Sequence, residues 1–243
     1  MAKDRNGNQG PDTSSDEIVE VLDERTPLAQ QGLELIERVF PPYDRQPVDQ
    51  IGMEIAEKRM GLLTSYDFHL FVARGDDGEA RAVATGVFLG GVNAGLVTYL
   101  AVRPEFRGNR LGRRIRVRLI DAFRGDARKM GFGDVAWVVG EVRQESPWLG
   151  RLLKERAVIP FDLNYYHPGV DPDGPDEKWV LYRQPVGDPR EKVPAAEVRQ
   201  LIYSIWRRAY RVRWPLQRDG FRAMLAELES RSMIGIHPEL GGS

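Results

Sequence analysis

The most constraining feature of this sequence is a strand, a loop and a long helix that follow one another between residues 94 and 131, with a second strand beyond them. The run AGLVTYLAV carries no charge, which is typical of a central strand covered on both faces. After the loop RPEFRGNRLG, apolar residues recur at helical spacing from Ile115 to Met130, until Gly131 ends the pattern. The apolar run DVAWVV at 134–139 predicts the second buried strand. Because a helix connects the two strands, they should lie parallel within one sheet.

Further strands and helices are predicted on both sides of this unit. Strands are expected at 17–23 and 178–184, and two β-rich runs predict a hairpin around the turn Gly75-Asp76-Asp77-Gly78. Helices are expected at 27–39, 48–62 and 146–156, and the Asp/Pro/Gly-rich stretch 168–176 is expected to be a loop. Two amphipathic segments, at about 194–211 and 217–231, predict C-terminal helices appended to the main sheet.

Composition narrows the class of protein. With 243 residues and 42% apolar content, the chain can form one large core, or a core with a small appendage. A formal net charge of -1 favours neither nucleic acid nor membrane partners, and no run approaches the roughly 20 apolar residues that span a bilayer. The polar segment 1–16 is expected to be a flexible tail rather than a signal peptide. The lack of cysteine excludes disulfides, thiolate metal sites and a cysteine nucleophile, and we expect a cytoplasmic protein.

The loop between the central strand and the long helix has the properties of a phosphate-binding site. Arg107-Gly108-Asn109-Arg110-Leu111-Gly112 leads into a helix that begins Arg113-Arg114-Ile115-Arg116-Val117-Arg118. A helix N-terminus offers unpaired N–H groups and a partial positive charge, which disfavours nearby cations by roughly 0.3 to 1 kcal/mol each. A bound anion would compensate these arginines. The alternative is a tight connection followed by a solvated basic helix face.

Around this loop the chain resembles the GNAT superfamily of N-acetyltransferases, whose signature is a strand ending in V-x-P, then R-G-x-G-x-G and a helix. The matching residues are Val102-Arg103-Pro104 and Arg107 to Gly112, with Arg110 in the place of the usual middle glycine. The element order agrees with the family from about residue 17 to 184. A P-loop nucleotide site and a dinucleotide-binding fold are disfavoured, because this loop has neither Gly-Lys-Ser/Thr nor Gly-x-Gly-x-x-Gly.

The resemblance implies a GNAT-like α/β (α+β) fold, with a mixed, mostly antiparallel central sheet, a parallel splayed strand pair and flanking helices. It implies an acyl-CoA-dependent N-acyltransferase domain at 17–188, between a disordered tail at 1–16 and a C-terminal helical extension at 189–243. Acetyl-CoA, or another acyl-CoA, would be the co-substrate, with its pantetheine beside strand 96–102 and its thioester carbonyl polarised by the N–H of Val102. The implied cofactor-binding residues are Ala101, Val102, Arg107, Gly108, Asn109, Arg110, Leu111, Gly112 and Arg113.

Acyl transfer to an amine also needs a base for the amine and a proton for the leaving thiolate. Glu141 follows the second strand of the parallel pair, near the expected splay, and is the predicted base or ammonium-binding residue. Many relatives have an acid tyrosine in the next helix, where this chain has Leu153. Tyr165 and Tyr166 are the predicted replacements, with core packing as their alternative role, and Tyr99 is a further candidate.

The histidines and the C-terminal arginines suggest fewer roles. His167 could act as a base, whereas His69 and His237 receive no role, and no metal is predicted because no ligand spacing is present. The segment LIYSIWRRAYRVRW combines arginines with aromatic residues, as nucleic-acid platforms do. Its apolar helix face favours packing on the main domain or on a second subunit. A homodimer is therefore one expected assembly, and nucleic acid is not an expected partner.

The predicted function is an N-acetyltransferase that moves an acetyl or short acyl group from acyl-CoA directly to a primary amine in one ternary complex. The sequence does not specify the acceptor, so a small-molecule amine and a protein amine both fit. An acyl-carrier-protein donor is an alternative, because the basic helix could face an acidic partner. The alternative functions are a non-catalytic CoA-binding sensor or interaction module, suggested by Leu153, and a nucleic-acid binder with salt-dependent affinity.

Overall fold

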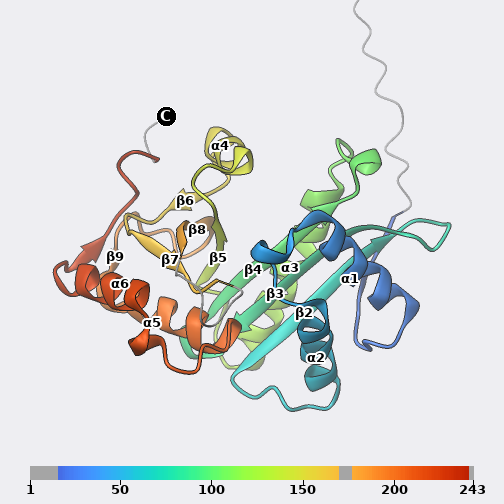
Figure 1. The fold of residues 1–243 in the computed structure, drawn as a ribbon, viewed down its shortest axis with the longest axis horizontal. Helices are drawn as coiled ribbons and strands as arrows, with labels where there is room; N and C mark the ends of the chain where they lie inside the picture. Colours follow the sequence, from blue (N-terminus) through green and yellow to red (C-terminus); the bar gives the residue numbers. More distant parts are fainter. Residues whose placement is uncertain (1–15, 170–176, 241–243) are drawn as a thin grey trace, which may run out of the picture.

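A computed structural model of the protein describes residues 16–169 and 177–240, which form a central sheet with helices on both faces (Figure 1). Residues 1–15, in the predicted tail, and 170–176, in the predicted loop, lie outside the described residues, as do 241–243. Within the described part, no helix is both long and apolar enough to cross a membrane.

The secondary-structure elements follow one another largely as predicted. The helices are α1 (Pro27–Val39), α2 (Val48–Arg59), α3 (Leu111–Lys129), α4 (Pro147–Lys154), α5 (Ala195–Ser204), which continues into a π-helical segment (Ile205–Ala209), and α6 (Asp219–Glu229). The strands are β1 (Glu17–Glu20), β2 (Tyr66–Arg74), β3 (Ala80–Leu89), β4 (Ala94–Val102), β5 (Trp137–Val142), β6 (Ile159–Pro160), β7 (Tyr165–His167), β8 (Glu177–Gly187), β9 (Val193–Pro194) and β10 (Met233–Ile234).

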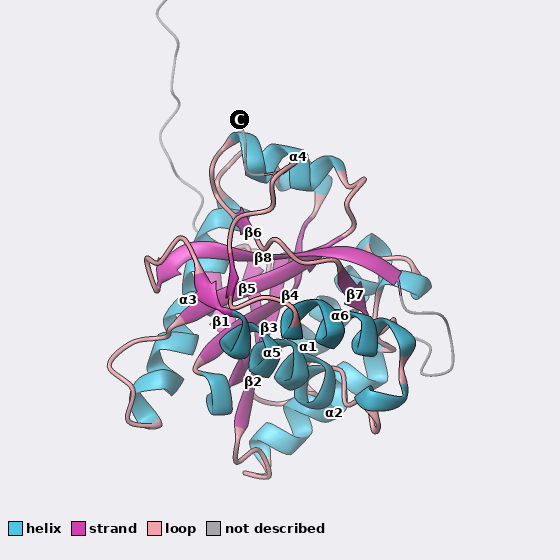
Figure 2. Cartoon of the chain, turned by 90° about the vertical axis from the view of Figure 1, so that its left-hand side faces the viewer, coloured by secondary structure: helices cyan, strands magenta, loops and turns pink. Residues whose placement is uncertain are grey.

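The strands of the main sheet lie in the order β1-β2-β3-β4-β5-β8-β6, and β7 also pairs with β8 (Figure 2). All of these pairs are antiparallel except β4 with β5, which are parallel. The predicted fold class, a mixed and mostly antiparallel sheet with one parallel pair, is confirmed. The helix α3 connects the two parallel strands, as the sequence pattern required.

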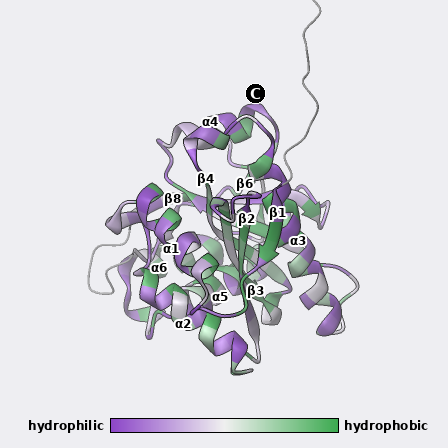
Figure 3. Cartoon of the chain, turned by 90° about the vertical axis from the view of Figure 1, so that its right-hand side faces the viewer, coloured by the Kyte–Doolittle hydropathy of each residue, from purple (hydrophilic) through white to green (hydrophobic). Residues whose placement is uncertain are grey.

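Two hydrophobic cores cover the two faces of the sheet, because side chains alternate along each strand. On β2, Leu70 and Val72 belong to the core under α1, α2 and α5, whereas Phe71 and Ala73 belong to the core under α3. Figure 3 shows apolar residues concentrated on the strands and hydrophilic residues on the outer surfaces of the helices. Both faces of the sheet are therefore covered by packed side chains.

The parallel strands β4 and β5 pair over only part of their length. The paired register runs from Ala94 with Trp137 to Val97 with Gly140. Next to the last pair, Thr98 lies at a shift in the β3–β4 register, which has the form of a β-bulge and bends the strand. Beyond it β5 continues to pair with β8, so β4 and β5 separate at this point. This separation is the splay that the resemblance implied.

The β5 strand differs from the sequence prediction by three residues at each end, covering 137–142 rather than 134–139. The apolar run stops at Val139, before Gly140 and the polar Glu141, so the sequence pattern placed the end of the strand too early. The carboxylate of Glu141 is compatible with a buried strand because two tyrosine hydroxyls donate to it. Tyr165 and Tyr166, expected in a loop, form β7.

Candidate active site

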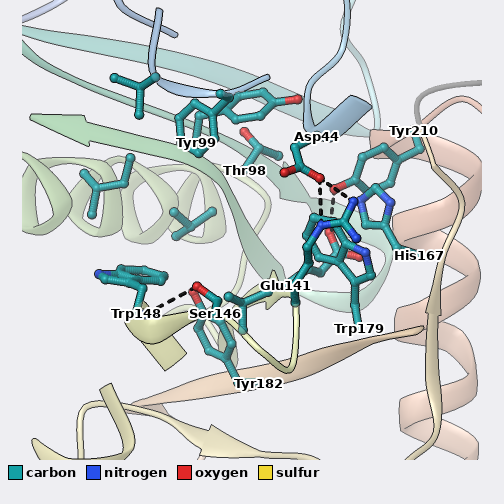
Figure 4. A pocket seen from close by; sticks show the side chains of 16 residues that line it. Asp44, Thr98, Tyr99, Glu141, Ser146, Trp148, His167, Trp179, Tyr182 and Tyr210 are labelled. Atoms are coloured by element: carbon teal, nitrogen blue, oxygen red, sulfur yellow. Dashed lines mark hydrogen bonds and ion pairs between the residues drawn. The ribbon is translucent and has the colours of Figure 1, made fainter. Parts of the chain in front are cut away.

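A cavity of about 280 Å³ opens where β4 and β5 separate (Figure 4). Its floor comes from β4 and β5, and its walls come from the end of α1, the start of α4, β7, β8 and the C-terminal segment. Trp148, Ser146 and Tyr182 lie toward one end, and Asp44, His167 and Tyr210 toward the other (Figure 4). The cavity therefore receives side chains from segments far apart in the sequence.

Glu141 is the buried acid of this cavity, with a side chain that is 3% exposed. The Tyr165 hydroxyl donates to its Oε1, and the Tyr210 hydroxyl donates to its Oε2 at 2.5 Å. Burial raises the pKa of Glu141 to about 7, against the opposing effect of these two hydrogen bonds. A carboxyl group with this pKa is present in both protonation states near neutral pH and can accept a proton there.

Both tyrosines that contact Glu141 are hydrogen-bond donors at neutral pH. Burial, followed by the charge of Glu141, raises the pKa of Tyr165 and of Tyr210 well above the usual value. Tyr166 follows Tyr165 on β7 and points to the opposite face, where Lys178 lies 5.9 Å from the centre of its ring. The two predicted tyrosines thus lie on different sides of β7, and Tyr165 is the one in contact with Glu141.

His167 forms an uncharged wall beside Glu141. Burial, followed by the charge of Arg143, lowers the pKa of His167 to about 3. The Gly169 N–H donates to Nδ1 at 2.9 Å, which assigns the ring proton to Nε2, 4.0 Å from Glu141 Oε2. The imidazole also stacks on Trp179 with ring centres 4.3 Å apart. A base role for His167, one sequence hypothesis, is not supported by this environment.

An ion pair closes the cavity beside this wall. Arg143, which follows β5, donates from Nε and Nη2 to Asp44 Oδ1 at 2.8 and 2.6 Å. Its guanidinium also lies over the rings of Trp179 and Tyr43, at 5.2 and 5.9 Å from their centres. The charge of Asp44 is therefore balanced within the wall.

The predicted phosphate loop leads directly from β4 into α3. Gly108 and Arg110 both have left-handed backbone conformations, with φ of 92° and 57°. The left-handed conformation is the one that favours glycine, and Arg110 adopts it without being a glycine. The first hydrogen bond of α3 runs from Arg114 N to Arg110 O, which leaves the N–H groups of residues 111–113 outside the helical ladder. With arginine at position 110, the loop still leaves unpaired backbone N–H groups at the start of α3.

The start of α3 lies close to the end of β4 at position 112. A Cβ atom on Gly112 would lie 3.3 Å from Val102 Cγ2. Arg107 donates from Nε to Val102 O at 3.1 Å, so the loop also contacts the end of the strand. Arg107, Gly108, Asn109, Arg110 and Arg113 are exposed, whereas Leu111 is buried in the core under α3. The predicted loop residues thus lie together, at the end of β4.

The direction of the backbone amides along β4 distinguishes the residues that face the splay. The N–H of Tyr99 bonds to Thr85 Oγ1 and that of Arg103 to Arg81 O, so both point toward β3. Amides alternate along a strand, and Ala101 therefore also faces β3, whereas Leu100 and Val102 face the splay. Of the two residues predicted to meet the pantetheine, Val102 thus directs its N–H toward the splay, whereas Ala101 directs its N–H toward β3.

Tyr210 is a site residue that the sequence reasoning missed. It follows the π-helical segment, where its N–H bonds to Ile205 O at 3.1 Å, and its ring contacts His167 edge-on at 4.6 Å. π-Helical segments occur often at functional sites, but no sequence signal marks this one. The available signal is the aromatic content of LIYSIWRRAYRVRW, although its apolar helix face predicts a packing surface.

A second polar cluster lies between β1, α2, β2 and α3. His69 Nδ1 lies 2.7 Å from Glu20 Oε1, and its Nε2 lies 2.6 Å from Asp126 Oδ2. Although burial alone lowers it, these hydrogen bonds raise the pKa of His69, and the pKa of Asp126 is correspondingly lowered. Asp67, His69 and Asp126 could surround an ion, but Lys58 Nζ lies 3.1 Å from Asp67 and 2.8 Å from Glu20. We interpret the cluster as a structural ion-pair network, in which an ammonium group supplies the cation.

Comparisons with known proteins agree with this geometry at the level of the fold. No model of a known protein family matches the chain, and no curated protein sequence matches it. A solved structure from Bacteroides thetaiotaomicron, described as a GNAT-family acetyltransferase, superposes with a TM-score of 0.58 at 14% identity, over 80% of this chain and 98% of the other. The Escherichia coli ribosomal-protein-S18-alanine N-acetyltransferase superposes with a TM-score of 0.45 at 16% identity, over 72% and 97% of the two chains.

The chain therefore has the GNAT acetyltransferase fold. The sequence motif, the parallel splayed pair and the shape of the whole domain all agree on this assignment.

Proposed function

We propose that the protein is an N-acyltransferase that moves an acetyl or short acyl group from acyl-CoA to a primary amine. The observation that carries the proposal is that three features lie next to one another along β4. An amide-rich, arginine-rich helix start follows its end, a splay opens along its edge, and a buried carboxyl group with a pKa of about 7 lies in the resulting cavity. Phosphate binding, thioester placement and proton transfer each need one of these features.

The loop and the edge of β4 would hold the acyl-CoA. The N–H groups of residues 111–113 and the side chains of Arg107, Arg110 and Arg113 offer donors and positive charge to the pyrophosphate. The pantetheine would add to the free edge of β4 beyond Val97, with the N–H groups of Leu100 and Val102 directed toward it. One of these two amides would polarise the thioester carbonyl and stabilise the oxyanion.

Glu141 would act as the general base. The amine nitrogen attacks the thioester carbon, the C–S bond breaks, the thiolate leaves, and the proton lost by the amine passes to the Glu141 carboxylate. Tyr165 and Tyr210 hold that carboxylate in one orientation through their hydroxyl groups. The proton on Glu141 then returns to solvent or to the thiolate, which completes the balance of the reaction. An acid role for Tyr165 or Tyr166 stays a prediction.

Two measurements on the full chain test the proposal. Isothermal titration with acetyl-CoA should give saturable binding, and a thiol-release assay with a library of primary amines should give turnover. Binding without release across the library would favour the CoA-binding sensor instead. Failure of acetyl-CoA to bind at all would contradict both functions.

A further inference from the structure

The acceptor end of the cavity has a composition that restricts which amine it can receive. Resting on the proposed function, we infer that the acceptor is a primary amine with one positive charge and a flat apolar body, and that diamines and polyamines are selected against.

Glu141 is the carboxylate of this end that is available to an ammonium group. Its partners are the neutral hydroxyls of Tyr165 and Tyr210, which leave its charge uncompensated when it is ionised. The other acid on the cavity wall, Asp44, is bonded twice by Arg143. A first ammonium group therefore finds a carboxylate, whereas a second one would meet a wall whose described acid, Asp44, is already paired with Arg143.

The remaining polar side chain at this end adds no charge. His167 is buried, its Nδ1 accepts from the Gly169 N–H, and burial lowers its pKa to about 3. It therefore presents a neutral ring next to Glu141 rather than a second anion or cation. Among the described residues that line the cavity, the charged side chains are Glu141 and the Asp44–Arg143 pair.

The walls around these charges are aromatic rings. Phe40 and Tyr99 pack together with ring centres 5.2 Å apart on one side, and Trp179, His167 and Tyr210 form a connected set on the other. Such faces favour a flat apolar group and also attract a cation through the ring quadrupole. With about 280 Å³ for the acceptor and the acyl-pantetheine end together, the body of the amine must be small.

The experiment compares 2-phenylethylamine with 1,4-diaminobutane by isothermal titration, on the full chain with and without saturating CoA. We expect 2-phenylethylamine to bind at least about tenfold more tightly, equivalent to about 1.4 kcal/mol. In Arg143→Gln, which frees the Asp44 carboxylate, the diamine should gain affinity and the preference should narrow by about threefold or more. Arg151→Gln, an exposed substitution of the same kind on α4, is the matched control and should leave the preference unchanged.

The inference is overturned if the diamine binds as tightly as 2-phenylethylamine, if neither amine binds, or if Arg143→Gln leaves the preference unchanged. These outcomes are separate from failure of the proposed function, which is measured by acetyl-CoA binding and thiol release. Acetyl-CoA turnover with a preference for the diamine would keep the acyltransferase and remove the inferred acceptor class. Amine selectivity without acetyl-CoA binding would remove the acyltransferase and leave a cavity that selects a flat amine with one charge.

Discussion

Replacing Tyr210 with phenylalanine should raise the pKa of Glu141 and shift the pH range in which the protein is active. The Tyr210 hydroxyl donates to Glu141 Oε2 at 2.5 Å, and the carboxylate is buried. A hydrogen bond to a charged group contributes about 1.5 to 3 kcal/mol, and one pKa unit corresponds to about 1.4 kcal/mol. Loss of this donor should therefore raise the pKa of Glu141 from about 7 to about 8 or 9.

The assay is the pH profile of kcat/KM in thiol release. As the proposed base, Glu141 would act in its unprotonated form, so the rate should rise with pH through its pKa, and this acidic limb should move upward by about one to two pH units in Tyr210→Phe. The same pKa can be followed without turnover from the ¹³C chemical shift of the Glu141 carboxyl group.

The matched control is Tyr203→Phe, which removes a hydroxyl group from an exposed residue of α5 that does not line the cavity. Its profile should coincide with that of the parent protein, whereas Tyr165→Phe should shift in the same direction as Tyr210→Phe, because it removes the other donor to Glu141. An unchanged acidic limb in Tyr210→Phe would refute the assignment of that limb to Glu141 and the role given to the hydroxyl group.

Three further substitutions test other parts of the molecule. Gly112→Asp should abolish acetyl-CoA binding with little change in thermal stability, because a carboxylate at a helix start repels phosphates but favours the helix; unchanged affinity would remove the loop from the site. Glu141→Gln should lower turnover more than acetyl-CoA affinity. It should also raise the free energy of unfolding, measured in urea at about pH 8, because the raised pKa means that the native protein loses stability as pH rises from 4.5 to about 7. His69→Gln should destabilise the protein more at about pH 6 than at about pH 9. The raised pKa of His69 stabilises the folded protein fully below the usual value of 6.5, and this stabilisation is lost as pH rises through the pKa of the folded state. An equal loss of stability at both pH values would show that the charge of His69 contributes nothing.

The sequence was sufficient for the fold because its strongest signals were local. The uncharged run of β4, the helical period of α3 and the turn of the β2–β3 hairpin each arise from neighbouring residues. The helix starts were also local, since Thr26 Oγ1 accepts from Ala29 N and Ser146 Oγ from Trp148 N, each followed by a proline. Boundaries were wrong where burial of a polar residue depended on a distant partner, as at Glu141.

The site was predictable only in part, because the properties of its buried polar residue also depend on partners that are distant in the sequence. Glu141 could be proposed because strand order places it at the splay, but its state depends on Tyr210, which is 69 residues away in sequence. No periodicity marks that contact, since it arises where a π-helical segment turns the chain. Arg110 shows the opposite case, because it departs from the glycine of the motif that the loop resembles and yet adopts the left-handed conformation that favours glycine.

The C-terminal segment is better explained as part of the folding unit than as an appendage. Val198, Leu201, Ile202 and Trp206 belong to the same core as the helices α1 and α2, and Trp206 is fully buried. Burial of each large apolar side chain contributes about 1.5 to 3 kcal/mol, so exposing these four would cost about 6 to 12 kcal/mol, which is comparable with the whole net stability of an ordinary domain.

Two consecutive residues of this segment, Tyr210 and Arg211, also form hydrogen bonds to two different elements of the main domain. Tyr210 bonds to Glu141 on β5, and Arg211, in a left-handed conformation with φ of 55°, bonds to Glu57 on α2 at 2.5 Å. A change that loosens the Arg211 contact would therefore act on Glu141 through Tyr210, without touching the cavity itself. Residues beyond the predicted domain boundary at 188 thus determine the chemistry of a carboxyl group that lies well before it.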